Sequence, residues 1–354
     1  MKYYLILYVM LLTQNAIASA LKSDEDLTLF PVYGALQPNQ SWQINLHAWV
    51  FEKEEKHFFN QQINKQFSKV LELKKNTAQQ QLFQQRLAPF LYDSESSKEI
   101  KLSLGNISKR FGKTQSNGHL YQQVWLKDQK PGTLMVKSDE RPDQQAKVFL
   151  IPETGLSIIS DVDDTIKISQ VTDKKRLLKN TFLEPFKAAK GMAVRYQQWA
   201  KQGAAFHYLS ASPWQLYTPL AQFIKQFNFP AGTFHMRQIR IKDSSIFSLI
   251  TSPKHTSPKQ YKLQQIEQIL QDFPKRTFIL VGDSGESDPD IYTAIGIRHP
   301  TQIAHIYIRQ VTPTAPTKNA KLQVPFTILQ PWTMMLQPLQ SNDNRRGIML
   351  KNIR

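Results

Sequence analysis

The chain has 354 residues, 41% hydrophobic and 21% charged, so it is long enough for two domains and too apolar to be a disordered chain. Its formal net charge of +17 favours anionic partners such as phospholipid head groups, nucleic acid or lipopolysaccharide, although solubility alone explains such a charge equally well. The lack of cysteine excludes disulfides, thiolate metal sites and a cysteine nucleophile.

Residues 1–20 have the pattern of a secretory signal peptide. Lys2 supplies the positive end, an apolar run follows up to Leu12, and Ala18-Ser19-Ala20 forms a small-residue cleavage site. We therefore expect cleavage after Ala20 and a periplasmic or secreted protein; an uncleaved anchor is the alternative. No later segment has the length of apolar residues that a membrane span needs, so we expect no transmembrane span in the mature chain.

Residues 28–150 are predicted to form a small β-rich domain with a helical insertion. Alternating apolar residues from Trp42 to Val50 indicate a half-buried strand. The spacing of Phe59, Ile63, Phe67 and Leu71 then indicates a helical face, which the Gln-rich run 79–85 continues. Further strands are expected at 100–104, 119–126, 133–137 and 146–151.

From residue 156 the pattern changes to alternating strands and helices, which predicts an α/β domain over 151–311 with a parallel sheet and helices on its faces. Strands are expected at 156–160, 204–210, 235–241, 277–281 and 303–308, and helices near 184–202, 214–227, 261–272 and 290–295. Ligands of such sheets bind at the carboxyl ends of the strands. Residues 312–354 are expected to be a C-terminal extension, partly packed and partly mobile.

The strongest local signal is Asp161-Val162-Asp163-Asp164-Thr165, which directly follows a predicted buried strand. Asp161 is suited to attack a phosphate as a nucleophile, and Asp163 to move protons as the general acid and base. Asp164 is expected to be structural, with its side chain capping the loop. A capped turn without chemistry is the plain alternative for the whole segment.

A second strand is expected to end at Ser210, followed by Ser212-Pro213-Trp214 at a predicted helix start. Ser210 is the expected phosphate contact, while Ser212 is more suited to cap the helix, whose N-terminus would attract phosphate oxygens. Trp214 is a candidate contact for a lipid chain, although a single aromatic residue on a helix is more often part of the core. Arg237 at a third strand, with Arg240 and Lys242, would meet lipid head groups or protect an exposed edge.

A lysine from the basic stretch 254–262 is expected to stabilise charge on the transferring phosphate, and Lys262 is preferred to Lys259 because it heads an amphipathic helix. The last segment runs from a buried strand through Gly282 to Asp283 and Asp288. Asp283 emerges at the same sheet edge as Asp161, so the two are expected to share a magnesium ion. Asp288 is expected to cap the next helix, to bind the metal or the lysine, or to combine these two roles.

Together these segments resemble the haloacid dehalogenase superfamily, and more closely the catalytic domain of phosphatidate phosphatases of the fungal actin-patch-associated type and their bacterial relatives, which are related to lipins. The matching strings are Ser-Asp-Val-Asp-Asp-Thr-Ile (160–166), His-Tyr-Leu-Ser-Ala-Ser-Pro-Trp (207–214), Lys-Leu-Gln-Gln-Ile (262–266) and Gly-Asp-Ser-Gly-Glu-Ser-Asp-Pro-Asp-Ile-Tyr (282–292). The resemblance covers roughly residues 150–310 and, more weakly, the β-rich region before them. Val162 stands where the family more often has Ile.

The resemblance implies a Rossmann-like fold, magnesium as cofactor and hydrolysis of phosphatidate to diacylglycerol and phosphate. It implies Asp161 as nucleophile, Asp163 as acid and base and, through its carbonyl, as a metal ligand, with Asp283 as a further ligand. Ser210 and Lys262 would contact the phosphate. We expect an anionic phospholipid substrate, peripheral contact with a membrane surface and no nucleic acid. The alternatives are a phosphatase for soluble monoesters and a non-catalytic protein that binds anionic membranes.

Overall fold

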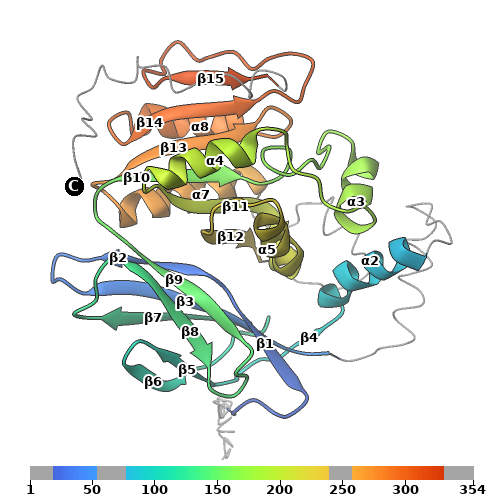
Figure 1. Ribbon diagram of the computed structural model, residues 1–354, viewed down its shortest axis with the longest axis vertical. Helices are drawn as coiled ribbons and strands as arrows, with labels where there is room; N and C mark the ends of the chain where they lie inside the picture. Colours follow the sequence, from blue (N-terminus) through green and yellow to red (C-terminus); the bar gives the residue numbers. More distant parts are fainter. Residues whose placement is uncertain (1–18, 54–76, 239–256, 331–354) are drawn as a thin grey trace, which may run out of the picture.

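The computed structural model describes residues 19–53, 77–238 and 257–330, which form two β-sheets joined by a short connection between residues 151 and 156. Figure 1 shows the two sheets one above the other, with the N-terminal sheet below. The predicted helical face at 59–71, most of the signal segment and residues 331–354 lie outside the described residues, as do Arg240 and Lys242. In the described part, no helix is long and apolar enough to cross a membrane.

The N-terminal sheet is mostly antiparallel and follows from the alternating pattern of its strands, whose inward side chains form a common core. Its strands are β1 (Glu25–Leu29), β2 (Val32–Leu36), β3 (Trp42–Glu52), β4 (Asp93–Ser94), β5 (Ile100–Leu104), β6 (Ile107–Phe111), β7 (His119–Leu126), β8 (Gly132–Ser138) and β9 (Gln145–Ile151). The long strand β3 pairs with β1, β2, β4 and β7. A β-rich N-terminal region is therefore confirmed.

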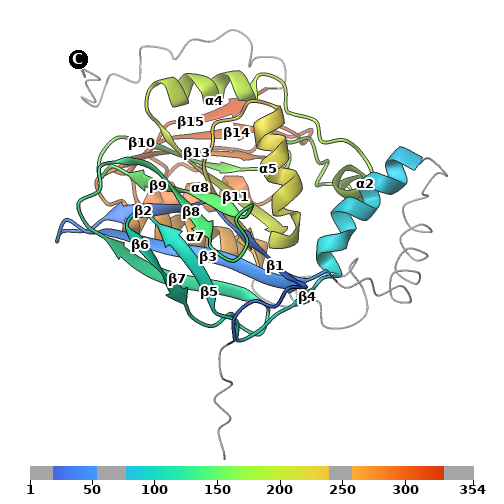
Figure 2. The same ribbon diagram turned by 60° about the horizontal axis from the view of Figure 1, so that its bottom comes forward.

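Helix α2 (Thr77–Leu87) lies beside α3 (Lys174–Phe182) in both views of the molecule (Figures 1 and 2). Arg86 joins the two parts of the chain, since its guanidinium donates to the carbonyls of Thr181 (2.8 Å) and Glu184 (2.7 Å). The Gln-rich run is thus a helix, as predicted, and α3 is a helix that the sequence pattern did not reveal.

The second sheet is wholly parallel, in the order β12-β11-β10-β13-β14-β15. Its strands are β10 (Leu156–Asp161), β11 (Ala205–Pro213), β12 (Thr233–Arg237), β13 (Thr277–Asp283), β14 (Ile303–Arg309) and β15 (Phe326–Leu329). An α/β fold with a parallel sheet is therefore confirmed. Strand β15 lies beyond the predicted boundary at residue 311, because its backbone pairs with β14 and extends the sheet.

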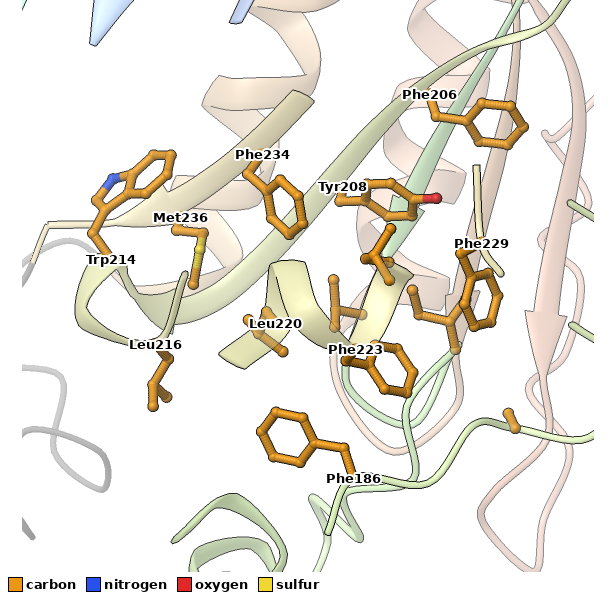
Figure 3. Close-up of a cluster of buried hydrophobic side chains, with 14 of the residues drawn as sticks. Phe186, Phe206, Tyr208, Trp214, Leu216, Leu220, Phe223, Phe229, Phe234 and Met236 are labelled. Atoms are coloured by element: carbon orange, nitrogen blue, oxygen red, sulfur yellow. The ribbon is translucent and has the colours of Figure 1, made fainter. Parts of the chain in front are cut away.

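Helices cover both faces of this sheet. Helices α4 (Met192–Lys201) and α5 (Tyr217–Gln226) pack on one face, and α7 (Pro258–Asp272) and α8 (Asp288–Arg298) pack on the other. Figure 3 shows Leu220 and Phe223 of α5 against Phe234 and Tyr208 of the sheet. The helix predicted from residue 184 begins only at Met192, because Gly191 adopts a left-handed conformation (φ 80°) before it.

Candidate active site

Three buried carboxylates meet at the carboxyl ends of β10 and β13. The two strands are parallel neighbours, so Asp161 and Asp283, the last residues of each, lie side by side. Asp288 joins them from the first turn of α8, and one oxygen from each carboxylate lies within 4.8 Å of the others. The structure thus brings together Asp161, Asp283 and Asp288 across 127 residues of sequence.

Asp161 is held in position by contacts to both of its oxygens. The Thr165 hydroxyl donates to Oδ2 (2.9 Å) and the Lys262 ammonium donates to Oδ1 (2.8 Å). Each carboxylate oxygen has a second lone pair, so both contacts leave room for a further partner. Thr165, the last residue of the motif, therefore orients the Asp161 carboxylate.

Lys262 is the buried cation of the site. Its Nζ lies 2.8 Å from Asp161, 2.7 Å from Asp288 and 2.9 Å from Glu286. It extends from α7, whose start is capped by the Ser257 side chain. Lys259, the alternative, instead pairs with Asp290 at the surface (3.3 Å). Sequence reasoning did not single out Glu286, although it stands within the fourth motif.

The loop after β13 shapes the position of Asp283. The Gly285 amide donates to Asp283 Oδ1 (2.5 Å), whereas Oδ2 is buried and has no hydrogen-bond partner among the residues that the structure describes. Asp288 Oδ2 accepts from the Asp283 amide (3.3 Å). The helix α8 is capped at Ser287, so the prediction that Asp288 is the capping residue was wrong by one position, while its contact with the lysine is present. Its carboxylate in the first turn also suits the helix dipole.

The cluster holds more carboxyl groups than cations. Burial, reinforced by the neighbouring carboxylates and opposed by Lys262, raises the pKa of Asp161 well above its ordinary value and raises that of Asp288. The same causes raise the pKa of Asp283 to about 8. Burial alone would lower the pKa of Lys262, but the carboxylates raise it well above its ordinary value. One ammonium therefore serves four carboxylates, and a further cation would relieve the imbalance.

Asp163 belongs to a separate group of contacts. Its Oδ1 lies 2.7 Å from Lys167 Nζ and accepts from Ser169 (2.6 Å), and its Oδ2 accepts from the hydroxyls of Ser210 and Ser212 (3.3 Å each). Burial would raise the pKa of Asp163, but the charge of Lys167 and these hydrogen bonds lower it. Its side chain is thus outside the three-carboxylate cluster, and sequence reasoning missed its partners Lys167 and Ser169.

Asp164 has a structural role, as its position in the motif predicted. Its backbone is left-handed (φ 53°), and its carboxylate accepts from the amides of Ser169 (2.8 Å), Gln170 (2.9 Å) and Val171 (2.6 Å). Arg309 donates to its carbonyl (2.5 Å). These contacts fix the loop that carries Ser169 to Asp163.

The second motif departs from the prediction at Ser212. Strand β11 continues through Ser212 to Pro213, and α5 begins only at Tyr217 after a 3₁₀ turn at Trp214–Leu216. Ser212 therefore caps no helix; its hydroxyl bonds Asp163 and its amide donates to the Ser210 hydroxyl (3.0 Å). The prediction that Ser212 caps the helix was wrong, because strand β11 continues through Ser212 with an irregular register.

Two predicted substrate contacts lie beside this group. Trp214 is buried, and its ring meets that of Phe30 at a tilt and that of His47 edge-on, with ring centroids 4.4 Å apart in each case. Arg237 ends β12, is half-buried and lines a cavity that Trp214 also borders. The structure therefore places both near the interface of the two sheets rather than in the carboxylate cluster.

Known proteins resemble part of this chain. Solved structures of the Pnkp1/Rnl/Hen1 complex align with 49% of this chain and 45% of that chain, with 13% identity and a TM-score of 0.31, which is too low to support an argument. Phosphatidate phosphatase APP1 of Saccharomyces cerevisiae is 35% identical over 215 residues, or 58% of this chain. An uncharacterized protein of Schizosaccharomyces pombe is 29% identical over 170 residues, or 47% of this chain.

The chain spans 35% of the length of the budding-yeast protein and 27% of the fission-yeast protein. Residues 156–310 match the family described as "Phosphatidate phosphatase APP1, catalytic domain". This segment contains every residue of the carboxylate cluster. The resemblance expected from the four motifs is thus confirmed, since residues 156–310 match this family model and the chain is 35% identical to a curated phosphatidate phosphatase over 58% of its length.

Proposed function

We propose that the chain is a magnesium-dependent phosphatidate phosphatase of the haloacid dehalogenase superfamily, with a Rossmann-like catalytic domain. The observation that carries the proposal is the buried group of Asp161, Asp283, Asp288 and Lys262 at the carboxyl ends of parallel strands, inside the segment that matches the family. The product would be diacylglycerol and phosphate. A periplasmic or secreted location and contact with anionic membranes remain part of the proposal, supported by the N-terminal pattern and the +17 charge.

The donor set suits a hard divalent cation. Asp161, Asp283 and Asp288 offer only oxygen ligands, and the partnerless Oδ2 of Asp283 is a buried acceptor that a cation would satisfy. These residues would hold magnesium, with the Asp163 carbonyl as a further ligand. When bound, magnesium would neutralise negative charge on the phosphate.

The chain's own residues account for the proton and phosphoryl transfers. An oxygen of Asp161 attacks phosphorus, the bond from phosphorus to the glycerol oxygen breaks, and Asp163 gives that oxygen its proton. Asp163 then takes a proton from water, whose oxygen attacks phosphorus and releases phosphate from Asp161. Thr165 orients the attacking carboxylate (2.9 Å), and Lys262 is placed to stabilise the phosphate oxygens.

A phosphate-release panel on the purified chain tests the proposal. Phosphatidate in mixed micelles with magnesium should be hydrolysed at least tenfold faster, by kcat/KM, than p-nitrophenyl phosphate and soluble sugar phosphates. Equal or reversed rates would instead identify a phosphatase for soluble monoesters. No release from any substrate would favour the non-catalytic, membrane-binding alternative.

A further inference from the structure

A cavity of about 560 Å³ lies between the N-terminal sheet and the edge of the parallel sheet. One wall comes from β2 and β3, through residues such as Tyr33 and Asn45, and Tyr121 of β7. The other wall is the edge strand β12 together with Tyr261 and Gln265 of α7. The Gln238 amide bridges the walls, since it donates to the Tyr121 hydroxyl (2.6 Å).

The cavity shares two short pieces of backbone with the catalytic residues. Trp214 borders it two residues after Ser212, which bonds Asp163, and the register of β11 shifts between Ser210 and Pro213. Tyr261 borders it next to Lys262, whose ammonium contacts Asp161. Figure 3 shows Trp214 beside Met236, another residue of the cavity wall. The cavity is therefore bordered by residues one or two positions along the chain from Lys262 and Ser212, two residues of the site.

The side of Asp163 is the side from which a leaving group departs. In an in-line displacement the leaving oxygen is opposite the attacking one, and it receives its proton from the general acid. A leaving group protonated by Asp163 would pass Ser212 toward Trp214. The non-reacting part of the substrate would then extend into the cavity.

The cavity lining suits an uncharged, amphipathic group. Among the described residues that line it, none is acidic and Arg237 is the one permanent cation. Burial lowers the pKa of His235 to about 4 and that of His47 well below its ordinary value, so both rings are neutral at pH 7. Aromatic rings and side-chain amides make up much of the remaining wall, which offers both apolar contact and hydrogen bonds.

We propose that this cavity receives the diacylglycerol part of the substrate, with the ester groups on the amides and an acyl chain against the aromatic rings. The inference rests on the proposed function, because the cavity would hold the leaving group of that reaction. Arg237 would attract the anionic lipid to the entrance. The proposal makes the N-terminal domain part of the substrate site, since Asn45 and Tyr121 belong to it.

Two residues on one strand provide a matched test. Tyr121 and Trp125 lie on the same face of β7 and are 45% and 46% exposed, but only Tyr121 lines the cavity. We would compare Tyr121→Ala with Trp125→Ala, and add Asn45→Trp to fill the cavity from an exposed position. The substrates are p-nitrophenyl phosphate and a short-chain phosphatidate kept below its critical micelle concentration, so that membrane contact plays no part.

Tyr121→Ala and Asn45→Trp should lower kcat/KM for the short-chain phosphatidate five- to tenfold, mainly through KM, and leave p-nitrophenyl phosphate hydrolysis unchanged. Trp125→Ala should change neither. If wild type hydrolyses phosphatidate and the cavity variants do so equally well, the cavity assignment is overturned while the proposed function stands. An equal loss in Trp125→Ala would also overturn it. If wild type hydrolyses only the soluble ester, the proposed function itself fails.

Discussion

At the scale of single residues, two aspartates of one motif have different surroundings. Burial and then the neighbouring carboxylates raise the pKa of Asp161, whereas Lys167 and hydrogen bonds outweigh burial and lower the pKa of Asp163. The difference follows from contacts made by other segments: Lys262 and Asp288 reach Asp161, and Ser210 and Ser212 reach Asp163. Spacing alone predicted both residues as functional, but it could not reveal Lys167 or Ser169 as partners.

Asp283 should be required for magnesium binding, because its Oδ2 is buried without another partner. We expect magnesium at a hundredfold excess over its Kd to stabilise wild type by about 2.7 kcal/mol and to raise Tm accordingly. In Asp283→Asn the shift should be largely lost. The matched control is Asp290→Asn, which changes an exposed carboxylate a few residues away and should keep the shift.

The thermal stabilisation by magnesium should increase as the pH rises. The pKa of Asp283 is raised to about 8 without a cation, so its neutral form stabilises the fold at low pH and this contribution is lost as pH rises through about 8. Magnesium would replace the lost stabilisation, so its thermal shift should be larger at pH 8 than at pH 6. A shift that is unchanged in Asp283→Asn, or that shrinks with pH, would contradict the assignment.

At the scale of elements, the parallel sheet could be predicted because buried strands have continuous apolar runs. Strands β10, β13 and β14 begin where the sequence predicted. Element ends were less predictable: β11 continues through Ser212 because its backbone still pairs with β12 at Pro213. Strand β15 and helix α3 were missed, since segments of four and nine residues are too short to give a clear periodic signal.

Gly282 shows how an element end fixes the site. The structure gives a physical reason for a glycine at this position. An added Cβ would lie 2.5 Å from Asp288 Oδ2 and 2.6 Å from the Tyr292 ring. Glycine is therefore needed for the close approach of α8 to β13.

Gly282→Ala should destabilise the protein by about 1–3 kcal/mol and reduce activity, because α8 and Asp288 must move. Urea unfolding and phosphate release measure the two effects. Gly112→Ala is the control, since an added Cβ there has no atom within 4 Å. Wild-type stability and activity in Gly282→Ala would show that the close packing of Asp288 is not required.

At the scale of the whole molecule, the two sheets are joined by aromatic and histidine side chains. Tyr33 of β2 bonds Asp272 at the end of α7 (2.6 Å), and its ring lies 5.5 Å from that of His207. His207 and His235 both bond Thr233 (3.0 Å each). This interface could not be predicted from the sequence, because the periodicity of a strand says which face is buried but not which partner covers it.

The buried histidines should make the protein sensitive to acid. Burial lowers the pKa of His119 and of His235 to about 4, so each neutral ring stabilises the fold above about pH 6.5 and this stability is lost as pH falls toward 4. The loss is on the order of 3 kcal/mol for each histidine. In His235→Asn the fall of unfolding free energy between pH 6.5 and 4 should be smaller, as urea titrations would measure. An unchanged slope would contradict a buried neutral His235.

The covalent state of Asp161 during turnover tests the central claim most directly. The chain is mixed with phosphatidate and magnesium, quenched in acid within the first turnovers, digested and examined by mass spectrometry. We predict a phosphoryl group on the peptide that contains Asp161, and neither this adduct nor phosphate release in Asp161→Asn, whose thermal transition should stay near that of wild type. Wild-type turnover by Asp161→Asn, or a phosphoryl group on another peptide, would contradict the account.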